Sequence, residues 1–525
     1  MTRVFSSWRD SARRNERAIQ LGAFIFAILA LLASWLTIIF NARSYANATS
    51  RYWWLADDIL ISMRYARNFA HGAGLAWNVG EHVEGFSNFL WTLWLSALHL
   101  LPISVAQISL AVLLTNVALG ALTLGAIFRL ARALDGNWLG ISAALAAFAI
   151  NRDALNWATL GYETTLVTFL FTRAFGELVR GLRWRAFALI AALALARADA
   201  IVLCALLYTL ALILHRDKRR ALIGLAASLL APLAYQIFRV SYYGAWLPNT
   251  AELKVFNWDT RFFAGALYAG DFIFAHAFLL ITALAVGIFT RDARLRWMLG
   301  GIAAYTLYVI YIGGDTSRLF RFFAPIIPAL LVIAFVGISN RVPRVIAIIS
   351  LLACLATIPR VNPLAELSNR TNANPNRDVE TALLIAQNTA PTSRIADFMV
   401  GATFYFSERP GIDLLGKVDS HIARLPAKPG LLMPGHNKWD FDYSISQLKP
   451  DLVIAPAADV MRDETLRAST YGKWYPQFTQ ELYAHPGFRE HCLPNPISRA
   501  TDRAVFVCDW SPEFARKDAW RALGE

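Results

Sequence analysis

Residues 21–40 of the chain read LGAFIFAILALLASWLTIIF, a stretch of twenty residues without a charge. A helix of about 20 apolar residues is long enough to cross the hydrocarbon core of a bilayer. The stretch is preceded by five arginines: Arg3, Arg9, Arg13, Arg14 and Arg17. A secretory signal peptide has a shorter apolar region followed by soluble sequence, whereas further apolar stretches follow here. We therefore expect a retained anchor with a cytoplasmic N-terminus.

The composition of the whole chain is typical of a membrane protein. Hydrophobic residues make up 56% of the 525 residues and charged residues only 17%, a balance that soluble globular proteins rarely reach. The apolar stretches predict about eleven transmembrane helices. These helices are expected over residues 19–41, 106–128, 137–150, 162–179, 185–197, 199–214, 220–239, 264–290, 297–312, 322–339 and 343–358.

Arginine clusters between these helices fall together on one side, which the positive-inside rule makes the cytoplasmic side of a bacterial inner membrane. They explain the net charge of +13, so we expect no nucleic-acid partner. The polar segments on the opposite side are 42–87, 151–161, 240–262 and 313–321. The apolar segment 88–103 must not cross the membrane if the arginine clusters are all to lie on the same side. We expect an interfacial helix there, with Trp91 and Trp94 at the membrane boundary.

The apolar stretches end at Pro359, and an odd number of crossings places the rest of the chain outside the cytoplasm. β-rich runs at 451–455 and 503–509 alternate there with a helical pattern at 378–387, which predicts a small α/β domain. The fold class is therefore an α-helical polytopic membrane protein with a C-terminal α/β extracytoplasmic domain. The predicted domains are residues 1–358 and 359–525.

Four cysteines are too few for a disulfide scaffold. Cys204 and Cys354 lie in apolar stretches, where small core residues are expected. Cys492 and Cys508 remain as a pair that could form a bridge in the tail.

The first polar segment contains two adjacent carboxylates, Asp57 and Asp58, directly after an aromatic stretch. Adjacent acids repel each other, so one of them tends to have a raised pKa or the pair recruits a cation. Either condition suits proton transfer to or from a hydroxyl group. The structural alternative is a helix start, because Asp in the first turn of a helix over 59–70 accepts free backbone amides.

Other polar residues of the outer segments are candidates for substrate binding. Arg64 and Arg67 share one face of the predicted helix, where their guanidinium groups could bind phosphate, or could pair with acids or lipid headgroups. The further candidates are Glu84, Asn88, Glu163, Tyr243, Asn249, Lys254, Asp315 and Arg321. For those in the three later segments the alternative is helix capping or an interfacial ion pair.

An ordered set of segments covers nearly the whole chain: ADDILISMRYARN (56–68), GAGLAWNVGEHVEGFSNFLW (72–91), GYETT (161–165), YYGAWLPNT (242–250), GGD (313–315), RFFAPIIP (321–328), IDLLGKVDSHIAR (412–424) and PGHNKWD (434–440). This set resembles the GT-C glycosyltransferases related to the mycobacterial terminal β-(1→2)-arabinofuranosyltransferase and to bacterial pilin arabinosyltransferases. The tail segment adds His436 to the candidates. The loop around 85–88 and the length of the tail differ from the mycobacterial pattern.

The resemblance implies a donor of the decaprenyl-phosphoryl-arabinofuranose kind and an essential acid in the first outer loop. The acceptor would be an extracytoplasmic glycan or glycoprotein, and its identity is left open, as is the retention or inversion of configuration. The essential acid falls on Asp57 and Asp58. Such a transfer requires stabilisation of the departing phosphate, a held sugar and a base for the acceptor hydroxyl. From this chemistry we expect acid/base catalysis by Asp57, orientation of the sugar or a cation by Asp58, hydroxyl binding by Glu163 and Asp315, and phosphate binding by Arg64, Lys254 and Arg321.

Two alternatives stay open at this level. A divalent cation could sit between the paired acids, although no histidine cluster marks a metal site. A lipid-linked glycan flippase would also need many spans and polar residues within them. Transporters usually place their site near the bilayer midplane, often between inverted repeats, whereas these acids lie in outer segments and no repeat is visible. We therefore favour the enzyme.

Overall fold

A computed structural model of the chain describes residues 2–46, 50–255, 258–315, 319–357, 359, 374–429, 431, 434–456, 474–494 and 503–519. The chain forms two compact units. The helical unit comprises Met1–Arg43, Leu113–Tyr235 and Gly265–Ser368, and the mixed unit comprises Ser44–Val112, Gln236–Ala264 and Asn369–Glu525. This division differs from the predicted boundary at 358, because two earlier polar segments pack with the tail. The assignment of a transmembrane and an extracytoplasmic domain stays a prediction.

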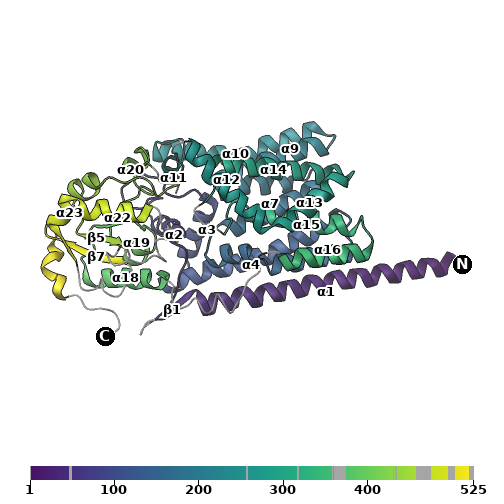
Figure 1. Cartoon of the computed structure of the whole chain (residues 1–525), viewed down its shortest axis with the longest axis horizontal. Helices are drawn as coiled ribbons and strands as arrows, with labels where there is room; N and C mark the ends of the chain where they lie inside the picture. The colour runs from purple at the N-terminus through teal and green to yellow at the C-terminus, as the bar shows by residue number, and fades with distance from the viewer. Residues whose placement is uncertain are drawn as a thin grey trace. The chain divides into compact units, whose positions relative to one another are not determined.

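The helical unit contains most of the apolar helices that the structure describes (Figure 1). Its elements, some of which extend beyond it, are α1 (Thr2–Ala42), α4 (Val105–Ala133), α5 (Trp138–Ala149), α6 (Arg152–Thr159), α7 (Thr164–Arg180), α8 (Trp184–Ala196), η1 (Ala198–Ala200), α9 (Ile201–Leu214), α10 (Lys218–Tyr243), α12 (Trp258–Ala275), α13 (Ala277–Phe289), α14 (Ala293–Ile312), η2 (Ala324–Ile326), α15 (Ile327–Ser339) and α16 (Arg344–Thr357). Helix α15 is buried along nearly its whole length and packs against α5 and α13, as expected of a helix that is apolar on all sides.

Four helices of the described chain are long and apolar enough to cross a membrane: Asn15–Ala42 within α1, α4, α10 and α14. The pair α12 and α13 would add a fifth span if counted as one, and several shorter apolar helices accompany them. The count of about eleven crossings therefore stays a prediction. Of the arginines before the first span, Arg3, Arg9, Arg13 and Arg14 lie outside the residues whose side chains are described.

The predicted single helix over 264–290 is wrong. Helices α12 and α13 are bent by 85° at the break between them, where His276 is fully buried. Its Nε2 lies 3.3 Å from the Asp153 carboxylate and its ring packs on Phe272 at 4.5 Å between centroids. Hydropathy alone did not reveal this break.

The mixed unit combines short helices with a sheet (Figure 1). Its elements are β1 (Ser44–Ala46), β2 (Arg51–Trp53), α2 (Asp57–Ala70), α3 (Phe89–His99), α11 (Asn249–Leu253), α18 (Asn374–Asn388), β3 (Ile395–Asp397), α19 (Ala402–Ser407), β4 (Gly411–Asp413), α20 (Ser420–Arg424), η4 (Asp442–Gln447), β5 (Leu452–Pro456), α22 (Trp474–Ala484), α23 (Pro486–His491), β6 (Cys492–Pro494), β7 (Arg503–Cys508) and η7 (Pro512–Ala519). Helix α3 occupies the segment predicted as interfacial, with Trp91 buried and Trp94 exposed.

The predicted α/β character of the tail is confirmed. Five strands form one sheet in the order β4-β3-β5-β7-β6, parallel from β4 to β5 and antiparallel from β5 to β6. The strands predicted at 451–455 and 503–509 are β5 and β7, and the helix predicted at 378–387 is α18. Cys492 and Cys508 face each other across β6 and β7 and form a disulfide, the pairing that the sequence had left possible.

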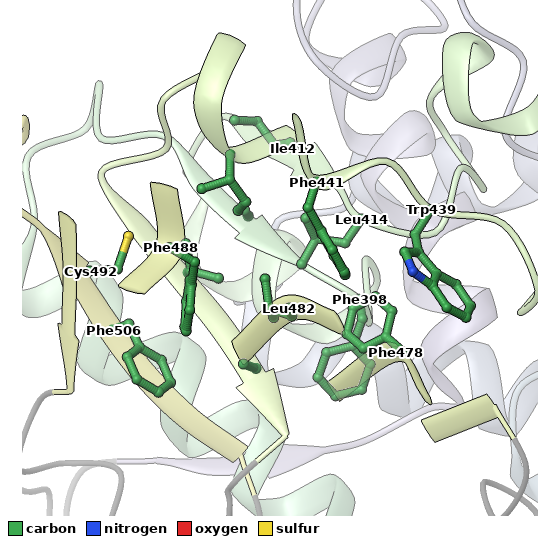
Figure 2. Packing of buried hydrophobic residues seen from close by; sticks show 14 of the residues in the cluster. Phe398, Ile412, Leu414, Trp439, Phe441, Phe478, Leu482, Phe488, Cys492 and Phe506 are labelled. Carbon is green, nitrogen blue, oxygen red and sulfur yellow. The ribbon is translucent and has the colours of Figure 1, made fainter. Parts of the chain in front are cut away.

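Aromatic side chains fill the core of this sheet region (Figure 2). Phe478 of α22 packs against Phe398, Phe441 and Trp439 with ring centroids 5.2–5.9 Å apart. Such ring pairs bury large apolar areas in defined geometries. The core therefore holds the loops that follow β3 and β4 in fixed positions, and these loops carry the residues described next.

Candidate active site

Asp57 is the first residue of α2, but its carboxylate does not cap its own helix. The N-cap residue of α2 is Ala56, which makes no side-chain cap bond. The Asp57 Oδ1 atom instead accepts hydrogen bonds from the backbone amides of Gly401 (3.0 Å) and Ala402 (2.9 Å) at the start of α19. Its Oδ2 atom is shielded from solvent and has no hydrogen-bond partner in the described chain. One oxygen is thus fixed and the other is available for chemistry.

Burial raises the pKa of the Asp57 carboxyl to about 6. The positive charge of Lys417 and the hydrogen bond from Ala402 oppose this rise, while Asp378 and Asp58 add to it. The expectation that one of the paired acids has a raised pKa is confirmed. Its main cause is desolvation rather than the mutual repulsion on which the expectation rested.

Asp58 recruits a cation from the tail. Its Oδ1 atom lies 3.3 Å from Nζ of Lys417, and the lysine side chain is only 12% exposed, whereas that of Asp58 is 47% exposed. Burial alone would lower the pKa of Lys417, but Asp58, Asp57 and Asp413 together raise it above its ordinary value. Lys417 is therefore a permanent cation at neutral pH, and it balances the charge of the acid pair.

The turn after β4 fixes the position of Lys417. Buried Asp413 accepts hydrogen bonds from the amides of Leu415 (2.9 Å) and Val418 (2.6 Å), while Gly416 adopts a φ of 80°, which favours glycine. Asn249 Nδ2 donates to the carbonyl oxygens of Gly416 (2.9 Å) and Lys417 (3.1 Å). The predicted site residue Asn249 thus supports the lysine turn from the segment at 236–264.

His436 and Lys254 belong to the same electrostatic environment. The pKa of His436 is lowered to about 3, mainly by burial and in addition by the charges of Lys417 and Lys254, while Asp58 opposes this shift. The imidazole is therefore neutral at physiological pH and can exchange hydrogen bonds without adding charge. Its Nδ1 lies 3.3 Å from the Pro434 carbonyl oxygen.

The two arginines of α2 have structural partners. Arg64 is buried, and its guanidinium donates to the carbonyl oxygens of Trp77 (2.7 Å) and Phe404 (2.8 Å) and to Asn78. Arg67 pairs with Glu408 at 2.8 Å. Arg64 thereby joins α2 to the glycine-rich loop and to α19. Three of its five N–H donors are engaged in these bonds, and its predicted role as a phosphate ligand stays a prediction.

Three other predicted residues also hold the mixed unit together. Buried Glu84 pairs with Arg239, with Nη2 3.1 Å from Oε1. Asn88 accepts from Ser62 (3.1 Å) and from Thr92. Tyr243 donates its hydroxyl to the Leu75 carbonyl oxygen (2.7 Å). These contacts fix the loop between α2 and α3.

The remaining predicted residues lie in the helical unit. Asp315 and Arg321 form an ion pair, with Oδ2 3.0 Å from Nε. The Arg321 guanidinium also lies 5.1 Å from the ring centroid of Tyr162. The neighbouring Glu163 is buried at the start of α7. A largely buried group of charged side chains of this kind stays a candidate ligand site.

No group of three or more His, Cys, Asp or Glu residues suited to a metal ion occurs within the residues that the structure describes. The site described above consists of an acid pair with the Lys417 ammonium group beside it. A carboxylate with a free, shielded oxygen and a pKa of about 6 can take a proton near neutral pH.

Two elements of this site were missed in the sequence. Lys417 lies within the segment 412–424 that carried the resemblance, and its signal was the single charge in the short apolar run 414–418. Gly401 carried no signal that we can name. A Cβ atom at this position would lie 1.9 Å from the Asp57 carbonyl oxygen, so only glycine allows this approach.

A protein-family model described as a domain of unknown function, DUF8728, matches residues 365–503. The chain is also similar to the terminal β-(1→2)-arabinofuranosyltransferases of two bacteria. The protein of Mycobacterium tuberculosis is 29% identical over 284 residues, which are 50% of this chain and 45% of the relative. That of Corynebacterium glutamicum is 27% identical over 342 residues, which are 54% and 48%. The chain thus spans a little under half the length of these curated relatives.

Solved structures with a similar fold include ArnT from Cupriavidus metallidurans bound to undecaprenyl phosphate, with a TM-score of 0.57, 11% identity and coverage of 92% of this chain and 98% of that one. The apo oligosaccharyltransferase of Archaeoglobus fulgidus has a TM-score of 0.53, 11% identity and coverage of 88% and 72%. At this identity the likeness concerns the fold alone. It confirms the predicted GT-C type of fold.

Proposed function

We propose that this protein is a membrane glycosyltransferase that moves a sugar, arabinofuranose by its similarity to the curated relatives, from a polyprenyl-phosphate donor to an extracytoplasmic glycan or glycoprotein. The donor class is supported by the similarity to two arabinofuranosyltransferases and by the fold shared with a protein bound to undecaprenyl phosphate. We further propose that the protein lies in a bacterial inner membrane, with the N-terminus in the cytoplasm and the mixed unit outside.

The proposed reaction is a single transfer. The acceptor O–H gives its proton to the Asp57 carboxylate, and the acceptor oxygen forms a bond to the anomeric carbon of the sugar. The bond between that carbon and the phosphate oxygen breaks, and its electron pair leaves with the polyprenyl phosphate, which gains one negative charge. Asp57 then passes the proton to solvent or to the departing phosphate.

The observation that carries this proposal is the state of the Asp57 carboxylate. Its Oδ1 is held by two amides and its shielded Oδ2 has no partner in the described chain. A group with a pKa of about 6 is mostly ionised at pH 7 and yet basic enough to accept a proton. A carboxylate with a purely structural role would be expected to have both oxygens engaged, as those of Asp413 are.

The test is the variant Asp57→Asn. Asparagine keeps the size and the Oδ1 acceptor, and it caps a helix about as well as aspartate, but it cannot take the proton. Transfer of radiolabelled sugar from a synthetic polyprenyl-phosphate donor to a membrane-extract acceptor should fall by roughly 100-fold or more. Thermal unfolding is measured in parallel to show that the variant is folded.

The matched control is Asp442→Asn. Asp442 is an exposed acid of the same unit that pairs with His485 at 3.1 Å, and its loss should leave turnover unchanged. Near-normal transfer by a folded Asp57→Asn protein would reject Asp57 as the base. Movement of intact donor across vesicles without any transfer would instead favour a flippase.

A further inference from the structure

The mixed unit places residues of the tail directly on the paired acids of the first outer segment. Asp57 is bonded to Gly401 and Ala402, 344 and 345 positions further along the chain, and Asp58 pairs with Lys417, 359 positions further. All three tail residues lie within 365–503, the segment matched by a domain of unknown function. The tail therefore contributes to the chemistry as well as to the architecture.

We infer that residues 365–503 are a catalytic partner domain, in which the amides of Gly401 and Ala402 orient the Asp57 carboxylate and the Lys417 ammonium balances the charge of the acid pair. Lys417 is a positioning residue in this scheme, since it acts through Asp57 and Asp58. The inference rests on the proposed transferase function, and it assigns a role to a segment for which the family description gives none.

The domain is built to hold these groups rigidly. Arg503 of β7 is buried and bonds Asp378 of α18 at 2.7 Å and also Asp397 at the end of β3. Thr403 of α19 donates its hydroxyl to the same Asp397 (2.7 Å). This buried network ties the first turn of α19 to the sheet. The two amides that bind Asp57 therefore cannot move independently of the core.

The charge balance around Asp57 can be followed group by group. Asp58 of its own helix and Asp378 of α18 raise the pKa of Asp57, whereas Lys417 lowers it. On the elements that pack against α2, Glu408 at the end of α19 is paired with Arg67, and His99 of α3 is bonded to Tyr405 at 3.0 Å. Lys417 is therefore the positive group that opposes burial at Asp57.

The consequence is a pH dependence that a purely structural lysine would not produce. If Asp57 must be ionised to act, transfer falls as the pH drops below about 6. In Lys417→Met the opposing charge is lost, and the pKa of Asp57 rises by about 1 unit, at the lower end of the effect of a close opposite charge. The acid limb of kcat/KM should move up by the same amount. Activity should then fall about fivefold at pH 6 and hardly at all at pH 8.

Two further variants test the direction in which the acid limb moves and the need for a positive charge at position 417. Lys417→Arg keeps a positive charge and should retain the acid limb near its original position. Asp58→Asn removes the negative neighbour of Asp57 and should move the acid limb to lower pH, the opposite direction. Because Asp58 is half exposed, Asp58→Asn should fold even if Lys417→Met does not. The acid limb of its kcat/KM profile is measured on the activity that remains.

The control is Lys428→Met. Lys428 also lies in the matched segment and also pairs with a carboxylate, Glu481, at 3.0 Å, so it reproduces the loss of an ion pair away from Asp57. Its acid limb should be unchanged. All variants are assayed in the full-length protein from pH 5 to 9 with the same synthetic donor, and thermal unfolding is recorded for each.

The outcomes separate this inference from the proposed function. Equal losses at pH 6 and pH 8 in folded Lys417→Met, or an unmoved limb in Asp58→Asn, would overturn the role of the partner domain while leaving Asp57 as the base. Full transfer by folded Asp57→Asn would reject Asp57 as the base, and the absence of transfer by the wild-type protein would overturn the proposed function itself.

Discussion

Replacing Gly401 with alanine should displace the Asp57 carboxylate without changing any charge. The new Cβ atom would lie 1.9 Å from the Asp57 carbonyl oxygen and 2.6 Å from its Oδ1, where ordinary contacts lie at 3.4–4 Å. The nearest of these atoms belongs to backbone, so the clash cannot be relieved by a rotamer change. Either the start of α2 or the start of α19 has to move.

The magnitude follows from two contributions. Overpacking costs about 1–3 kcal/mol, and hydrogen bonds to a charged carboxylate contribute about 1.5–3 kcal/mol each. Loss of one such bond together with the clash gives roughly 3 kcal/mol or more. At about 2–4 °C per kcal/mol, the Tm should fall by roughly 6–12 °C. Transfer should fall about 100-fold, because a displacement of about 1 Å at a reacting group has this effect.

The assay combines thermal unfolding in detergent with transfer of radiolabelled sugar. The hydrogen bond from the backbone amide of Ala402 lowers the pKa of Asp57. If the displacement weakens this bond, the pKa rises and the acid limb of the residual activity should move to higher pH. The control is Gly300→Ala in α14, where an added Cβ meets no atom within 4 Å and a helical alanine is favoured by up to about 1 kcal/mol. A Gly401→Ala protein with wild-type Tm and turnover would refute the reasoning that backbone amides fix this carboxylate.

Two predictions concern the tail and the orientation of the chain. The double variant Cys492→Ser, Cys508→Ser removes the disulfide between residues separated by 16 positions. It should lose about 3 kcal/mol of stability. Equal Tm values for this variant and the oxidised wild type would contradict this prediction. Single cysteines at the exposed positions Val79 and Glu490 should react with an impermeant thiol reagent in intact cells, since the two native free cysteines are buried. Protection of both sites would reverse the proposed orientation.

The sequence by itself determined the class of the protein and the positions of most elements. Hydropathy is a local property, so it located the apolar helices, and runs of β-favouring residues located β5 and β7. The adjacent acids were recognised from their neighbours in the chain, and α2 begins at Asp57, two residues before the predicted helix start. The disulfide partners were found because only two cysteines lie outside the apolar stretches.

The tertiary structure decided which of the polar residues act together. Arg64 was predicted as a phosphate ligand from its neighbours, and only the structure showed that its guanidinium also donates to carbonyl groups of the 72–88 loop and of α19. Lys417 and Gly401 became site residues only when the tail was placed beside α2. These partners lie more than 340 positions from Asp57 and Asp58. The pKa of the base depends on desolvation and on charges brought together by folding, and no local pattern in the sequence encodes either.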